Sequence, residues 1–212
     1  MKILAHRGFW MNESEKNSRE AIKRAFDYGF GIETDLRDIC GKIVISHNCP
    51  EGNEVSFEDI LNDLDSRKLM LALNIKADGQ SEEIIRLLNK FKVSDYFTFD
   101  MSIPEMVVQS KQDIYYFTGV SDICREGVLY ENSSGVWLDS FDNLWYDRFE
   151  LCGIIKKVIT QDHKKLCIVS EDLHHRDVMK QWECIKSVNY VGNESLFLCT
   201  DKPLEAKEFF NV

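Results

Sequence analysis

Two histidines and an arginine near the N-terminus have residue types and positions that suit phosphate chemistry. His6, Arg7 and Gly8 directly follow a short apolar run, and His47 follows a second one. Arginine presents a fork of donors that fits a phosphate, and glycine lets the backbone turn close to a ligand. Histidine can act as an acid or a base near neutral pH, although a single histidine is more often a structural hydrogen-bonding group. Together these residues favour acid–base chemistry at a phosphate, which needs one acid, one base and nearby cations.

A pair of carboxylates lies between the two histidines in the sequence. Glu33 and Asp35 are two residues apart in an apolar run, flanked by Ile32 and Leu36. On a strand this spacing places both side chains on the same side. Two neighbouring carboxylates repel unless a cation or a proton lies between them, and oxygen ligands suit Mg²⁺ or Ca²⁺. The alternative is one solvated acid beside one acid in a salt bridge.

Short apolar runs alternate with amphipathic segments along the chain, and this pattern predicts parallel strands connected by helices. The predicted strands cover residues 2–5, 30–36, 69–76, 96–99, 114–118, 136–138, 165–169 and 196–200, with an added strand over 43–47. A helix is predicted over 172–186, with His174, His175 and Arg176 in its exposed first turn. Eight such units fit a single (β/α)8 TIM barrel of the α/β class, and an open doubly wound sheet is the alternative.

Ionisable and polar residues gather where these predicted strands end. In a (β/α)8 barrel the carboxyl ends of the strands carry the active site. The residues at these ends are His6, Arg7, Glu33, Asp35, His47, Asn74, Lys76, Asp100, Asp139, Glu171 and Asp201. Polar and ionisable groups therefore cluster where a barrel would place its pocket.

Composition limits the classes of partner. The chain has 212 residues, 44% of them hydrophobic, and no linker-like stretch, which predicts one domain over residues 1–212. The net charge of −10 argues against nucleic-acid binding, which needs a basic face. No apolar run approaches the roughly 20 residues of a membrane span. The apolar stretch at the N-terminus is too short for a signal peptide. The odd number of cysteines, 7, favours reduced thiols, so we expect a cytoplasmic protein.

Several of these motifs together resemble the glycerophosphodiester phosphodiesterase family. The matching segments are His6-Arg7-Gly8, Asn17-Ser18, Gly31-Ile32-Glu33-Thr34-Asp35, Gly41 to His47, and Thr200-Asp201-Lys202-Pro203. The resemblance covers roughly the first 80 residues and the last dozen, whereas the middle of the chain matches in architecture more than in residues. It implies the same (β/α)8 barrel that the strand pattern predicts.

The resemblance also implies a role for each matching residue. His6 and His47 would be the general acid–base pair, with Arg7 and Lys76 as cations on the phosphate. Glu33 and Asp35 would hold a divalent metal, Mg²⁺ or Ca²⁺. The resemblance also implies that Asn74 lies at the metal.

Three positions depart from the family pattern. Asn74 stands where the family usually has a third acidic metal ligand, Lys16 replaces a glutamate, and Asn48 replaces an aspartate. An amide oxygen can ligate Mg²⁺ or Ca²⁺, but it brings no charge, so we expect weaker metal binding. Glu171 or Asp139 could supply the missing carboxylate.

The sequence therefore predicts a metal-dependent phosphodiesterase that hydrolyses a glycerophosphodiester or a related polyol or sugar phosphodiester. Its partner would be a small phosphodiester molecule. One alternative is a barrel that binds a phosphorylated sugar or glycan without turning it over. Another is a metal-independent enzyme in which Arg7 and Lys76 supply the positive charge.

Overall fold

The computed structural model describes residues 1–212, which pack as two compact units. The N-terminal unit is Ala5–Tyr116, and the C-terminal unit is Phe117–Val212 together with Met1–Leu4. Strand β1 (Lys2–His6) begins in the C-terminal unit and ends in the N-terminal unit.

The strands of the N-terminal unit pair in the order β5, β4, β2, β1. They are β2 (Gly31–Ile39), β4 (Leu71–Ile75) and β5 (Tyr96–Phe99), and β3 (Lys42–Ile45) runs antiparallel to β2 as the added strand. In the parallel pairing of β2 with β4, Asp35 is opposite Asn74. The register therefore places two predicted site residues side by side at the carboxyl ends of neighbouring strands.

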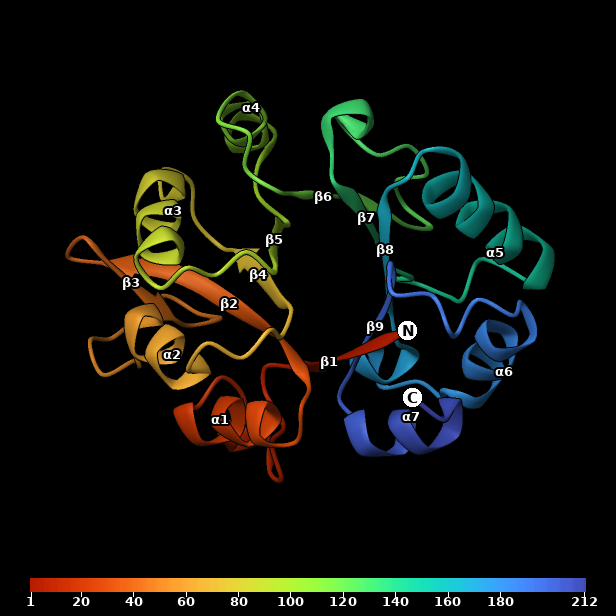
Figure 1. Ribbon diagram of the computed structural model, residues 1–212, viewed down its shortest axis with the longest axis horizontal. Coiled ribbons are helices and arrows are strands. Elements are labelled where there is room, and N and C mark those ends of the chain that lie inside the picture. Colours follow the sequence, from red (N-terminus) through yellow and green to blue (C-terminus); the bar gives the residue numbers. More distant parts are fainter. The chain divides into compact units, whose positions relative to one another are not determined.

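Four helices cover these strands: α1 (Arg19–Asp27), α2 (Phe57–Leu64), α3 (Ser81–Lys90) and α4 (Ile103–Lys111), with the 3₁₀ turn η1 (Glu13–Glu15) before them. Consecutive helices lie side by side, from α1 at the bottom of Figure 1 to α4 at its top. Ser18 begins α1 as its N-cap, because its hydroxyl accepts a hydrogen bond from the Ala21 amide. The apolar face of α1 is fully buried, which fixes the helix beside the loop that carries Arg7.

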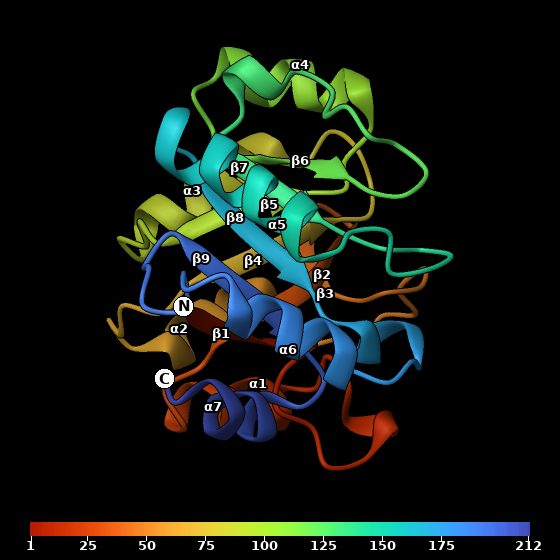
Figure 2. The ribbon, with the colours of Figure 1, turned by 90° about the vertical axis from the view of Figure 1, so that its right-hand side faces the viewer.

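The C-terminal unit contains four parallel strands, paired in the order β6, β7, β8, β9 and then β1. They are β6 (Phe117–Val120), β7 (Gly135–Leu138), β8 (Lys165–Val169) and β9 (Leu196–Thr200). The helices are α5 (Arg148–Ile155), α6 (Met179–Ser187) and α7 (Pro203–Phe210), with a π-helical segment η3 (Lys156–Gln161) directly after α5. Two 3₁₀ turns, η2 (Tyr130–Asn132) and η4 (Glu171–His174), complete the unit. In Figure 2, α5 and α6 lie in front of β8 and β9.

Eight parallel strands alternating with seven α-helices form a (β/α)8 barrel, so the predicted fold class is confirmed. The interior strands are continuous buried runs, for example all five residues of β4 and of β9. No helix is both long enough and apolar enough to cross a lipid bilayer. That residues 1–212 behave as one domain stays a prediction.

The helix predicted over residues 172–186 is wrong in its first half. The chain forms the short turn η4, and His175 then takes a left-handed conformation with φ 57°, which ends the turn. The carboxylate of Asp172 accepts hydrogen bonds from the Thr200 hydroxyl and the Asp201 amide, so the chain here is bound to the end of β9. Helix α6 begins only at Met179.

The strand predicted over residues 114–118 is displaced toward the C-terminus. Regular pairing with β7 begins at Phe117, opposite Gly135, and continues to Val120. Before it, Tyr116 makes only an isolated bridge to Thr98. The apolar residues at 114–116 are therefore packed as an approach to the strand rather than as part of it.

Candidate functional site

The turn after β1 places Arg7 against the start of α1. Arg7 and Gly8 both have left-handed backbone angles, with φ 55° and 88°. A Cβ atom on Gly8 would lie 2.7 Å from the backbone carbon of Ala21, so only glycine fits this approach. The Arg7 amide donates to the Glu33 carbonyl oxygen at 2.9 Å, which ties the turn to β2.

Asp35 is the centre of a cluster of cationic and donor groups. Its carboxylate is fully buried, with Oδ2 2.9 Å from Arg7 Nε and Oδ1 3.3 Å from both Lys76 Nζ and His47 Nδ1. Asn17 donates to Oδ2 from its side-chain amide at 2.8 Å. Burial raises the pKa of Asp35, but Arg7 and Lys76 outweigh it and hold the pKa below its usual value. Asp35 therefore gathers groups from four different segments of the N-terminal unit around one ionised carboxylate.

His47 is held in place by two arginines. Arg37 Nε donates to the His47 carbonyl oxygen at 3.1 Å, and Arg7 Nη2 lies 2.8 Å from His47 Nδ1. The contact with Arg7 requires Nδ1 to accept a hydrogen bond, because a guanidinium only donates. The contact with Asp35 requires Nδ1 to donate one, because a carboxylate only accepts. The Arg7 contact is the shorter, and it favours a lone pair on Nδ1 and the ring proton on Nε2. Nε2 then remains for a substrate.

Glu33 lies in a different environment from Asp35, although both are on β2. Its side chain is buried, His6 Nε2 lies 3.8 Å from Oε2, and the Arg7 amide donates to Oε2 at 3.3 Å. Burial, followed by the negative charge of Asp35, raises the pKa of Glu33 to about 7. Glu33 and Asp35 are two residues apart on β2, and a metal shared by their carboxylates stays a prediction.

The oxygen atoms around β2 and β4 fit a hard divalent cation. Asn74 donates through Nδ2 to Asp100 Oδ2 at 3.3 Å, while its buried Oδ1 has no hydrogen-bond partner. Asp35 Oδ1 is also buried without a well-aligned hydrogen bond. These oxygens and the Glu33 carboxylate form a donor set of the type that Mg²⁺ or Ca²⁺ prefers. No group of three or more Asp, Glu, His or Cys side chains is placed to hold a metal.

A cleft of about 500 Å³ lies on the N-terminal unit, within the size range of small-molecule sites. Its lining includes Arg7, Lys16, Asn17 and His47 together with acidic Glu20 and Glu54, but not the carboxylates of β2. Lys16, which departs from the family pattern, therefore adds a cation to the cleft. Such local positive charge can offset the net charge of −10 for an anionic ligand.

Asn17 belongs to a segment that matches the family motif, but the sequence predicts no role for it, and the structure places its side chain against Asp35. The Thr34 hydroxyl donates to its Oδ1 at 2.8 Å, so the amide is fixed with its Nδ2 toward Asp35. Its backbone is left-handed, with φ 64°. The position of Asn17 immediately before the N-cap of α1 was the available signal, but that pattern also fits a helix cap.

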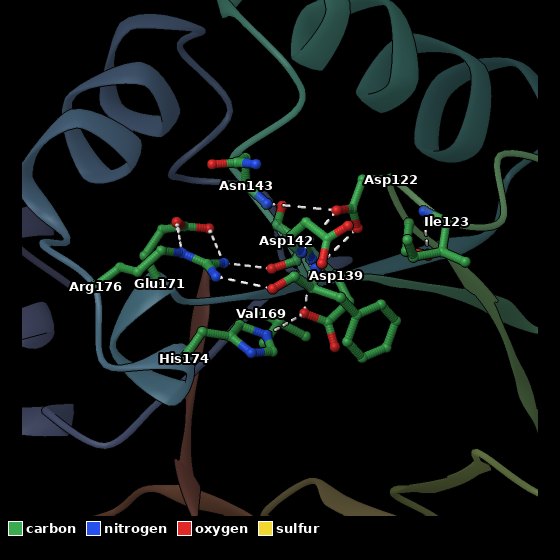
Figure 3. Close-up of polar contacts among 12 residues, drawn as sticks. Asp122, Ile123, Asp139, Asp142, Asn143, Val169, Glu171, His174 and Arg176 are labelled. Carbon is green, nitrogen blue, oxygen red and sulfur yellow. Dashed lines mark hydrogen bonds and ion pairs between the residues drawn. The ribbon is translucent and has the colours of Figure 1, made fainter.

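A second polar cluster occupies the C-terminal unit (Figure 3). Arg176 binds both oxygens of Glu171, with Nε 2.6 Å from Oε2 and Nη2 3.2 Å from Oε1. The same guanidinium donates to the carbonyl oxygens of Ser140 and Phe141, which fastens the loop after β7. Nearby, His174 Nε2 lies 2.7 Å from Asp139 Oδ1. Arg176 and His174 are thus engaged in a structured loop rather than in an exposed helical turn.

The structure places seven of the eight predicted site residues in the N-terminal unit. They are His6, Arg7, Glu33, Asp35, His47, Asn74 and Lys76. Glu171 lies in the C-terminal unit, where Arg176 neutralises its carboxylate. A role for Glu171 at a metal stays a prediction.

The fold and these groups define a class: a (β/α)8 barrel with ionisable residues at the carboxyl ends of its strands. No family model and no curated protein matches the chain. Solved structures, in contrast, are similar to this chain. A glycerophosphodiester phosphodiesterase from Agrobacterium tumefaciens strain C58 is similar with a TM-score of 0.73 and 14% identity, over 100% of both chains. A phosphodiesterase from Oleispira antarctica, in complex with the product sn-glycerol-3-phosphate, is similar with a TM-score of 0.69 and 13% identity, over 100% of this chain and 97% of the other. At these identities the likeness establishes a shared fold, as the motif resemblance implies.

Proposed function

We propose that the protein is a phosphodiesterase that hydrolyses a glycerol-linked or related polyol phosphodiester. The observation that carries this proposal is the cluster around Asp35, where Arg7, Lys76 and His47 all lie within 3.3 Å of one carboxylate. Two members of this cluster, Arg7 and His47, also line the cleft of about 500 Å³, which supports access of a small ligand to them. The similar fold of the Oleispira phosphodiesterase, whose complex contains sn-glycerol-3-phosphate, supports the same substrate class.

His6 and His47 would share the proton transfers of the reaction. One imidazole takes the proton from the attacking hydroxyl as the new phosphorus–oxygen bond forms, and the other gives a proton to the departing alcohol oxygen. Arg7 and Lys76 would bind the phosphate oxygens, where negative charge is concentrated. The roles are proposed for the pair, without assigning acid and base.

Glu33, Asp35 and Asn74 are the residues we propose to hold a divalent cation. A bound Mg²⁺ or Ca²⁺ would stabilise negative charge on the phosphate oxygens. The buried Asn74 Oδ1, which has no hydrogen-bond partner, and the raised pKa of the buried Glu33 carboxyl support this assignment.

A metal-independent reaction is the second candidate, and one observation favours it. Arg7 and Lys76 already neutralise Asp35 in the protein alone, so positive charge is present without a metal. Release of product from glycerophosphocholine and from an aryl phosphodiester, in Mg²⁺, Ca²⁺ or Mn²⁺ and in EDTA, separates the candidates. Turnover only with metal supports the first candidate, and equal turnover in EDTA supports the second. No turnover of either substrate under all conditions contradicts both and favours a barrel that binds a phosphorylated sugar or glycan.

We expect Asn74→Glu to tighten divalent-metal binding by at least about tenfold, because carboxylate count tunes the affinity of such sites. Asp35 is opposite position 74 in the strand register, so the new carboxylate would adjoin the proposed site. Calorimetric titration of Mg²⁺ and Ca²⁺ into both proteins measures the change. Asn74→Gln is the matched control, since it lengthens the side chain without adding charge. Unchanged affinity would mean that the new carboxylate pairs with Lys76, and no binding by either protein would end the metal assignment.

A further inference from the structure

The connection between β6 and β7 is the one strand-to-strand crossover that contains no α-helix. Residues 121–134 form a loop with only the turn η2, whereas helices normally cover the faces of parallel strands. A cavity of about 370 Å³ remains beside these strands, within the size range of small-molecule sites. Its apolar lining comes from β6, β7, α5 and η3, through Val120, Val136, Ile154 and Val158.

The helix that forms one wall of this cavity is irregular. α5 continues after Ile155 as the π-helical segment Lys156–Gln161, and Lys157 and Val158 of that segment line the cavity. π-helical turns are rare and are found disproportionately at functional sites. This wall of the cavity is therefore π-helical in part, unlike an ordinary α-helix packed on a sheet.

Two cations stand beside the apolar lining. Arg125 stacks on Trp145, with its Cζ 3.8 Å from the ring centroid, and Trp145 is itself fixed by donating from Nε1 to the Asp139 carbonyl oxygen at 2.7 Å. This stacking occupies the face of the guanidinium and leaves its N–H edge to a ligand. Lys157 is exposed and pairs with Asp162 at 2.9 Å, a weak surface pair that a ligand can replace.

We propose that this cavity binds a small anionic amphiphile, a molecule with an alkyl or aryl body and a phosphate or carboxylate head. The apolar body would contact Val136, Ile154 and Val158, and the head would bind Arg125 and Lys157. Glu126 also lines the cavity, so its three ionised lining groups sum to +1 in a chain of net charge −10. The volume suits a chain or a ring and is too small for a helix of a partner protein.

This site is independent of the proposed reaction. All its lining residues lie in the C-terminal unit, and none is among the residues proposed to hold metal, bind phosphate or transfer protons. Binding alone therefore tests it, and loss of turnover elsewhere does not affect the result.

Calorimetric titration with octyl phosphate, below its critical micelle concentration, provides the test. We expect saturable binding at one site, tightening about fourfold for each methylene added from hexyl to octyl phosphate. Octanoate should also bind, because it has the same combination of chain and anionic head. Inorganic phosphate and octanol should bind far more weakly, since each lacks half of the ligand.

Two variants assign the binding to this cavity. Ile154→Trp obstructs its apolar part, and the double substitution Arg125→Gln with Lys157→Gln removes both cations while leaving the apolar lining intact. Each should weaken octyl phosphate binding by about tenfold or more. Lys156→Gln is the matched control, because Lys156 is an exposed neighbour that does not line the cavity. Absence of saturable binding, or binding that the double substitution leaves unchanged, would overturn the proposal.

Discussion

Replacing either His6 or His47 is expected to lower phosphodiester turnover by about 10²–10⁴-fold, the usual contribution of a general acid or base. Both side chains belong to the N-terminal unit, and each is placed beside one of the two carboxylates of β2. His6 lies 3.8 Å from Glu33, and His47 lies 3.3 Å from Asp35. Loss of either imidazole removes one proton transfer without removing the carboxylate beside it.

Alanine and asparagine substitutions together separate catalysis from structural support. Asparagine keeps a hydrogen-bonding amide but cannot titrate, so both substitutions should give the same loss of kcat if the imidazole transfers a proton. His163→Asn is the matched control, since His163 is exposed in a loop and its left-handed backbone, φ 54°, suits asparagine. Circular dichroism should show an unchanged fold in every variant. Near-normal turnover in either the His6 or the His47 variants would remove that residue from the proposed pair.

The alternation of apolar runs was enough to predict most of the elements, because buried parallel strands and amphipathic helices differ in period. This pattern failed where residues are buried but do not take part in regular strand pairing. Ile114 and Tyr116 are buried, yet regular strand pairing starts only at Phe117. It failed again at His175, whose left-handed conformation ends a turn that residue types alone do not mark. Backbone angles of this kind depend on tertiary contacts such as the bonds from Asp172 to the end of β9.

The sequence predicted which residues belong to the candidate site more fully than it predicted the contacts between them. The strand ends identified His6, Arg7 and His47, and the structure brings Arg7 and His47 into contact across 40 positions of sequence. The role of Asn17 could not be read in this way, because an asparagine before a helix has an obvious structural use. The sequence also treats Glu33 and Asp35 as an equivalent pair, whereas the fold gives one of them several cationic partners and the other almost none.

That inequality leads to a prediction about stability in the absence of metal. The folded protein should lose about 3 kcal/mol of unfolding free energy between pH 5 and pH 8 through Glu33 alone. Its pKa is raised from 4.5 to about 7, because the carboxylate is buried beside the charge of Asp35. Between these values the folded state binds more protons at Glu33 than the unfolded state does. Stability from this group is therefore greatest at low pH and falls as the pH rises toward 7.

Urea unfolding in EDTA, measured across this pH range for the wild type and Glu33→Gln, tests the prediction. The glutamine keeps the shape of the side chain and stays neutral, so the difference between the two proteins isolates the titration of Glu33. We expect the unfolding free energy of the variant, relative to that of the wild type, to increase as the pH rises, by about 3 kcal/mol at pH 8. Parallel stability curves would show that Glu33 is already compensated in the protein alone. The need of this buried carboxylate for a cation, which supports the metal assignment, would then disappear.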